Sequence, residues 1–116
     1  MEESFFMIDE DRAMFTFKEK KATVRVFCED IMFFESYGHY ITVHMKDKST
    51  YTFRGRLKDI DEVLEKHGFM RVHRGFIVNP SYVHRVRCTA LSLGTDRESV
   101  PVSRLYKPRV YKELKV

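Results

Sequence analysis

Short runs of alternating apolar and polar residues restrict what this chain of 116 residues can fold into more than any other feature does. These runs mix β-branched and aromatic residues with polar ones, which is the pattern of strands that bury one face. They are residues 13–17, 22–27, 40–45, 50–53 and 82–88. A further run, residues 31–34, is apolar at every position, which favours a central strand covered on both faces. The sequence therefore predicts a mostly β protein built from short strands.

One segment has the period of a helix instead. Leu57, Ile60 and Leu64 fall on a single face, so we expect the main helix over roughly residues 56–67. A second, short helix is expected over about residues 103–113. Because a helix-turn-helix needs two adjacent helices joined by a tight turn, any DNA binding by this chain has to use strands and loops.

Charge is distributed unevenly along the chain, whose formal net charge is +4. Residues 1–69 carry 11 Lys and Arg against 14 Asp and Glu, a net charge of −3, whereas residues 70–116 carry 10 against 3, a net charge of +7. This polarity fits a domain that presents one basic side to phosphate groups. A solvated basic surface without a partner explains the charge equally well, so sequence motifs have to decide between the two.

Length and hydropathy indicate a single cytoplasmic domain. No run approaches the roughly 18 apolar residues of a membrane span, and the first ten residues lack the cationic start of a signal peptide. We expect residues 1–11 to be a flexible lead-in or linker remnant and residues 12–116 to form the domain. Cys28 and Cys88 lie in strand-like runs without Cys-x-x-Cys spacing, so we expect two small core residues and no disulfide.

Three motifs occur in a fixed order: DIMFFESYGH at residues 30–39, FMRVHRGFIVN at residues 69–79, and VPVSR at residues 100–104. In this order and at this spacing the chain resembles the LytTR family of DNA-binding domains over roughly residues 12–113. The resemblance implies an elongated, mostly antiparallel β-fold of about ten short strands. It also implies that loops on one face of the domain enter successive major grooves of a duplex, as in a transcription regulator.

The resemblance assigns base contacts to His39, Arg74 and Arg104. A guanidinium fork suits guanine O6 and N7, and an imidazole offers one ring nitrogen to a base edge or phosphate. The residues assigned to backbone contacts or loop support are Tyr37, Gly38, His73, Gly75, Asn79, Arg85, Arg87 and Ser103. We interpret Asn79 as a turn-forming residue ahead of Pro80, and we expect Arg85 and Arg87, on one face of a strand, to contact phosphates.

Other classes of function are weighed against this one. No nucleophile elbow, metal-ligand spacing or phosphate-cradling Gly-rich loop is found, so we expect no enzyme, metal or cofactor. An RNA-binding or protein-interaction module is the alternative that stays open. If the resemblance holds, the partners are double-stranded DNA with promoter direct repeats, a second copy on that DNA, and an upstream receiver domain in a two-component system. The chain would then be either part of a longer protein or a stand-alone regulator.

Overall fold

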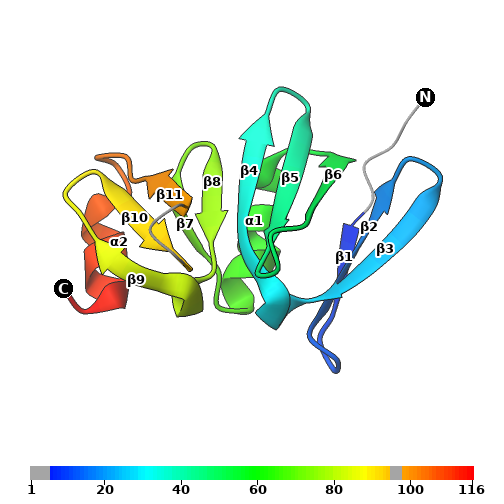
Figure 1. Ribbon diagram of the computed structural model, residues 1–116, viewed down its shortest axis with the longest axis horizontal. Helices are drawn as coiled ribbons and strands as arrows, with labels where there is room; N and C mark the ends of the chain where they lie inside the picture. The colour runs from blue at the N-terminus through cyan, green and yellow to red at the C-terminus, as the bar shows by residue number, and fades with distance from the viewer. Residues whose placement is uncertain (1–5, 95–97) are drawn as a thin grey trace.

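The computed structural model describes residues 6–94 and 98–116 and arranges them in an elongated molecule of 41 × 26 × 26 Å (Figure 1). Three antiparallel sheets follow one another along the long axis. The first has the strand order β1-β2-β3: β1 (Phe6–Asp9), β2 (Met14–Glu19) and β3 (Ala22–Phe27). The central sheet has the order β6-β5-β4-β8-β7: β4 (Ile31–Tyr37), β5 (Tyr40–Met45), β6 (Thr50–Arg54), β7 (Met70–His73) and β8 (Phe76–Val78). The third has the order β11-β10-β9: β9 (Val83–Val86), β10 (Ala90–Leu93) and β11 (Glu98–Pro101).

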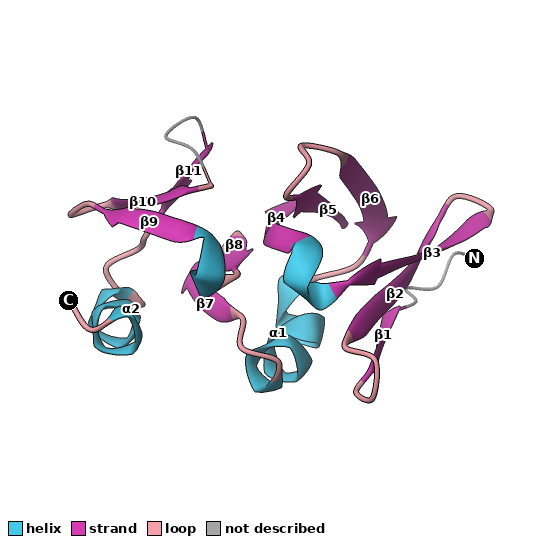
Figure 2. Cartoon of the chain, turned by 60° about the horizontal axis from the view of Figure 1, so that its bottom comes forward, coloured by secondary structure: helices cyan, strands magenta, loops and turns pink. Residues whose placement is uncertain are grey.

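Two α-helices, α1 (Leu57–Lys66) and α2 (Lys107–Leu114), lie on the same side of the sheets (Figure 2). Both contact β7, the edge strand of the central sheet. The apolar stripe of α1 is buried as expected. The second helix begins at Lys107, four residues later than expected, and Pro108 occupies its first turn, where proline is tolerated. Short 3₁₀ turns are formed by Cys28–Asp30 and Pro80–Tyr82.

Strand β4 belongs to both hydrophobic cores of the domain. Ile31 and Phe34 pack in a core with α1 and the aromatic residues of β2, whereas Met32 and Phe33 pack in a second core with β10, β11 and α2. Strict alternation would put Met32 and Phe33 on opposite faces. A shift in the pairing register with β5 between Ile31 and Phe33 marks a β-bulge, which accounts for their shared side.

The mostly β, antiparallel fold with a main helix near residues 56–67 is confirmed, as is the central, doubly buried strand over residues 31–34. The structure differs from the expected lead-in at Phe6–Asp9, which pairs with β2 as strand β1. The Phe6 ring stacks on Phe15 with a centroid distance of 6.3 Å, so this segment contributes to the core. Residues 1–5 lie outside the described part of the chain.

The two cysteines have different environments, and the expectation of two core residues is wrong for Cys88. Cys28 is buried directly after β3, and this burial raises the pKa of its thiol. Cys88 is exposed in the turn between β9 and β10, where its Sγ accepts a hydrogen bond from Nζ of Lys107 at 3.1 Å. The alternating run at residues 82–88 therefore extends past the end of the strand it predicted.

Candidate nucleic-acid interface

Three connections lie on one long side of the molecule, the upper side in Figure 1. They are residues 38–39 between β4 and β5, residues 74–75 between β7 and β8, and residues 102–106 between β11 and α2. We call them the first turn, the second turn and the third loop, and together the loop edge. They contain the three residues to which sequence resemblance assigns base contacts. Loops far apart in sequence are thus presented side by side.

Backbone hydrogen bonds connect the three parts of the loop edge. The amide of Ser36, near the first turn, donates to the carbonyl of Gly75 in the second turn at 2.9 Å. The amide of Ser103 in the third loop donates to the carbonyl of Val72 on β7 at 3.0 Å. These bonds fix the distances between the three connections. Without them, the connections could move relative to one another.

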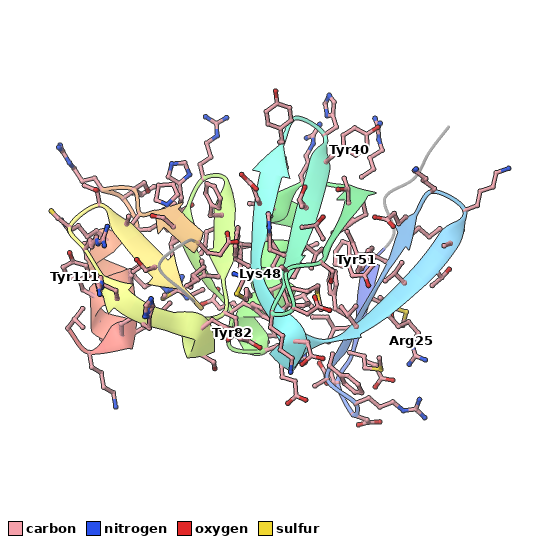
Figure 3. All side chains as sticks on the ribbon, in the orientation of Figure 1. Arg25, Tyr40, Lys48, Tyr51, Tyr82 and Tyr111 are labelled. Carbon is pink, nitrogen blue, oxygen red and sulfur yellow. The ribbon has the colours of Figure 1, made fainter. Side chains whose placement is uncertain are left out.

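The first turn is a tight hairpin in which Tyr37 and Tyr40 pair directly across the two strands. Gly38 has φ +60° and His39 does not have a positive φ, the combination found in a type II′ turn. His39 is exposed at the tip, and its carbonyl accepts a hydrogen bond from the amide of Gly55 at 2.9 Å. Tyr37 is 85% exposed, and Tyr40 points outward on the same upper side (Figure 3).

In the second turn, Arg74 is exposed while His73 is turned inward. Nδ1 of His73 accepts a hydrogen bond from the amide of Gly75 at 3.0 Å, and its ring meets Phe76 edge-on at a centroid distance of 5.5 Å. His73 therefore shapes the turn, whereas Arg74 projects from it. No side-chain partner of Arg74 is found among residues 6–94 and 98–116.

The third loop exposes Arg104 and Leu105, and Leu105 is 83% exposed. Ser103 supports this loop through its backbone, because its carbonyl accepts hydrogen bonds from the amides of Tyr106 and Lys107, each at 3.1 Å. The Oγ atom of Ser103 is buried and has no partner in the described part of the chain. Ser103 is therefore placed to hold the loop, and its hydroxyl does not face outward.

Three other predicted residues lie outside the loop edge. Asn79 is at the opposite end of β8 from the second turn, where its side chain accepts from the amide of Ser81 and donates to the carbonyl of Ile31, at 3.1 and 3.0 Å. It forms the turn that we expected of it. Arg85 on β9 and Arg87 just beyond it are both exposed. The turn that follows Arg87 is joined to the start of the third loop by a hydrogen bond between Val102 and Thr89.

Sequence reasoning missed a group of cations beside the first two turns. An open groove next to the first turn is lined by His39, Arg54, Gly55 and Arg56. A larger groove next to the second turn is lined by Ser36, Arg56, Leu57, Lys58, Arg71, His73, Arg74 and Gly75. The missed cations, Arg54, Arg56 and Lys58, belong to residues 1–69, whose net charge is negative, so comparing the net charges of residues 1–69 and 70–116 concealed them. They lie between the end of a strand that pairs with the first hairpin and the start of the main helix, and this position is the signal that could have revealed them.

The loop edge is thus a row of exposed cationic and hydrogen-bonding side chains on a hydrogen-bonded backbone. Lys107, the first residue of α2, follows the third loop directly, and its hydrogen bond to Cys88 raises the pKa of its ammonium group. Such a row suits a ligand that carries regularly spaced negative charge. Within the described residues, no group of His, Cys, Asp or Glu could hold a metal ion, and neither helix has the length and apolar character needed to cross a membrane.

Comparison with known proteins identifies the class. The model of the LytTr DNA-binding domain family matches residues 21–115, so the chain belongs to the LytTR family of DNA-binding domains. It is 30% identical over 100 residues to the sensory transduction protein LytT of Bacillus subtilis strain 168, and the alignment covers 83% of this chain and 41% of that relative. The chain therefore spans less than half the length of this curated relative.

The fold is also similar to that of a solved structure. This is the LytTr DNA-binding domain of a Bacillus cereus protein described as a methyl-accepting/DNA response regulator. The TM-score is 0.73 at 27% identity, and the match covers 90% of this chain and 98% of the other. The elongated β-fold is thus the fold of a DNA-binding domain of response regulators.

The two turn glycines should respond differently to the same substitution. Gly38→Ala should destabilise the domain by about 1 kcal/mol, because alanine is strained at positive φ even though no atom lies within 4 Å of the added Cβ. Gly75→Ala is the matched control: its φ is not positive, and the new Cβ would lie 3.7 Å from Nδ1 of His73, an ordinary contact. Urea unfolding of both variants measures the difference. Equal stability of the two variants would show that the first turn does not need its glycine.

Proposed function

We propose that this domain binds double-stranded DNA sequence-specifically, by inserting the loop edge into the major groove, and that it acts as a transcription regulator. The observation that supports the proposal most strongly is the alignment of three connections on one side of a domain whose family binds DNA. Exposed His39, Arg74 and Arg104 stand on three different connections. Hydrogen bonds between these connections give the row a fixed geometry.

The dimensions of the domain suit a duplex. Its long axis measures 41 Å, and the loop edge runs along that axis (Figure 1). One helical turn of B-DNA is about 34–36 Å, so the whole domain laid on one face of a duplex spans about one turn. The three connections of the loop edge can then enter the major groove along that face of the duplex.

Arg74 and Arg104 are the proposed base readers, with His39 as a weaker one. An exposed guanidinium on a fixed turn can donate two parallel hydrogen bonds to guanine O6 and N7, which distinguishes guanine from the other bases. A neutral imidazole makes one such bond. Tyr37, Gly38, His73, Gly75 and Ser103 have supporting roles, because they shape or flank the loops. Asn79 supports the framework from the turn at the other end of β8, and we propose that Arg85 and Arg87 contact phosphates.

The partners follow from the same proposal. We propose that two copies bind side by side on promoter direct repeats, because the loop edge is a single asymmetric row. Since the chain spans 41% of the relative named as a sensory transduction protein, we also propose that it serves as the output domain of a two-component response regulator with an upstream receiver domain. Such a regulator works in the cytoplasm, and no catalytic role is assigned to it.

Base reading is tested by comparing a preferred duplex with a scrambled one at fixed salt. Arg74→Ala and Arg104→Ala should each weaken binding to the preferred site by about 1–3 kcal/mol and binding to the scrambled duplex by less. His39→Ala should act in the same direction more weakly. Arg25→Ala is the control, because Arg25 is an exposed residue of β3 on the opposite side of the molecule from the loop edge (Figure 3). If all three variants lose equal factors on both duplexes, these residues are not base readers.

Backbone contact is tested by salt dependence. The logarithm of the association constant should fall linearly with the logarithm of salt concentration, with a slope of roughly −0.9 for each phosphate contacted. Arg85→Ala and Arg87→Ala should weaken binding to all duplexes alike and each make this slope shallower by about one contact. Binding that does not change with salt contradicts the proposal. Single strands and RNA of equal length, titrated at the same salt, test the alternative of an RNA-binding module.

A further inference from the structure

Arg71 belongs to the net-positive residues 70–116, but its side chain faces into the protein. It lies on β7, and its side chain is only 13% exposed. Nη1 is 3.2 Å from Oδ2 of Asp61 on α1, Nη2 donates to the carbonyl of Arg74 at 2.5 Å, and Nε donates to the carbonyl of His73 at 3.3 Å. Its guanidinium carbon also lies 6.0 Å from the ring centre of Tyr106. Arg71 thus joins α1, the second turn and the end of the third loop.

The two carbonyls that Arg71 binds, those of His73 and Arg74, lie where the backbone departs from regular strand geometry. The pairing of β7 with β8 shifts register between Arg71 and His73, the mark of a β-bulge. A bulge interrupts the ladder of hydrogen bonds, so its carbonyls need other donors. The fork of a guanidinium can bind two carbonyls and a carboxylate at once, whereas a lysine ammonium is a single point of charge.

We propose that Arg71 is the positioning residue of the loop edge: it holds the second turn in the conformation that presents Arg74, and Asp61 in turn holds Arg71. This inference rests on the proposed function. Arg71 acts from inside the protein and not by touching DNA, because each of its three guanidinium nitrogens is already bonded to a protein group. Arg71 contributes to base specificity through Arg74, and it does not contribute to the non-specific attraction between positive charge and phosphates.

The sharpest test is the pair of substitutions Asp61→Asn and Asp59→Asn. Both remove one negative charge from α1, and only Asp61 contacts Arg71. A more positive protein should bind any duplex slightly better, which is what we expect of Asp59→Asn. Asp61→Asn should instead weaken binding to the preferred duplex by about fivefold or more while scrambled duplex is bound no worse. Equal effects of the two variants would overturn the proposal.

Arg71→Lys separates positioning from phosphate contact, because it retains the charge and loses the fork. We expect binding to the preferred duplex to fall about tenfold, with the affinity for scrambled duplex and its salt slope unchanged. In the background of Arg74→Ala, the same substitution should have little further effect, since Arg71 acts through Arg74. If Arg71→Lys binds both duplexes like the parent chain while Arg71→Ala weakens both and lowers the salt slope, Arg71 is a phosphate contact and the inference is wrong.

A readout without DNA distinguishes failure of this inference from failure of the proposed function. Asp61→Asn should shift the backbone amide resonances of Arg74 and Gly75 in the free domain, and Asp59→Asn should not. If these resonances do not respond to Asp61→Asn, the positioning role is refuted whatever the DNA results are. If they respond and the parent chain does not discriminate between duplexes, the turn is held as described but the proposed function fails.

Discussion

Strand β4 is buried on both faces over residues 31–34, and the two hydrophobic cores of the domain meet there. Everything that positions the loop edge is connected to this strand. Its C-terminal end carries the first turn, its pairing with β8 brings the second turn alongside, and β7 beyond β8 holds the third loop by a backbone hydrogen bond. A polar residue at any of the four positions 31–34 would have to be buried without a partner, which costs several kcal/mol in an apolar core. The central strand therefore fixes where the exposed loops lie.

Because the loops are attached to this central strand, their framework is already formed before a ligand binds. Short connections tied by backbone bonds lose little conformational freedom when a ligand orders them, so more of the interaction energy remains for affinity. Two arginines near the second turn have different roles in this framework. Arg74 projects from a held turn, whereas Arg71, three residues earlier, uses its donors to hold that turn. Arg74 is available to a partner because Arg71 holds the turn on which Arg74 stands.

The elements that the sequence predicted are those with a local pattern of alternation or helical periodicity, because such a pattern reports burial, which drives folding. The sequence predicted the doubly buried strand, the main helix and five further strands, which are β2, β3, β5, β6 and β9. It did not reveal β1, whose contribution comes from stacking of Phe6 on the distant Phe15. It also placed Cys88 in the core, because the alternating run continues past the point where β9 ends.

For the candidate site, the motifs located the three connections, but they could not say which side chains face outward. His73 and Arg74 are adjacent and both polar, yet only the structure shows that Nδ1 of His73 is bonded within the turn. Arg56 and Lys58 come from a segment with net negative charge and still line the groove beside the second turn. These facts depend on tertiary neighbours, which no local pattern contains.

The most direct test of the account is selection of bound sequences from a random duplex pool, run in parallel with the parent chain and with the double variant Arg74→Ala, Arg104→Ala. We expect the parent chain to enrich two short direct repeats on one face of the duplex and the double variant to enrich no motif. Enrichment of the same motif by both proteins, or of none by either, would contradict the claim that the loop edge reads DNA sequence.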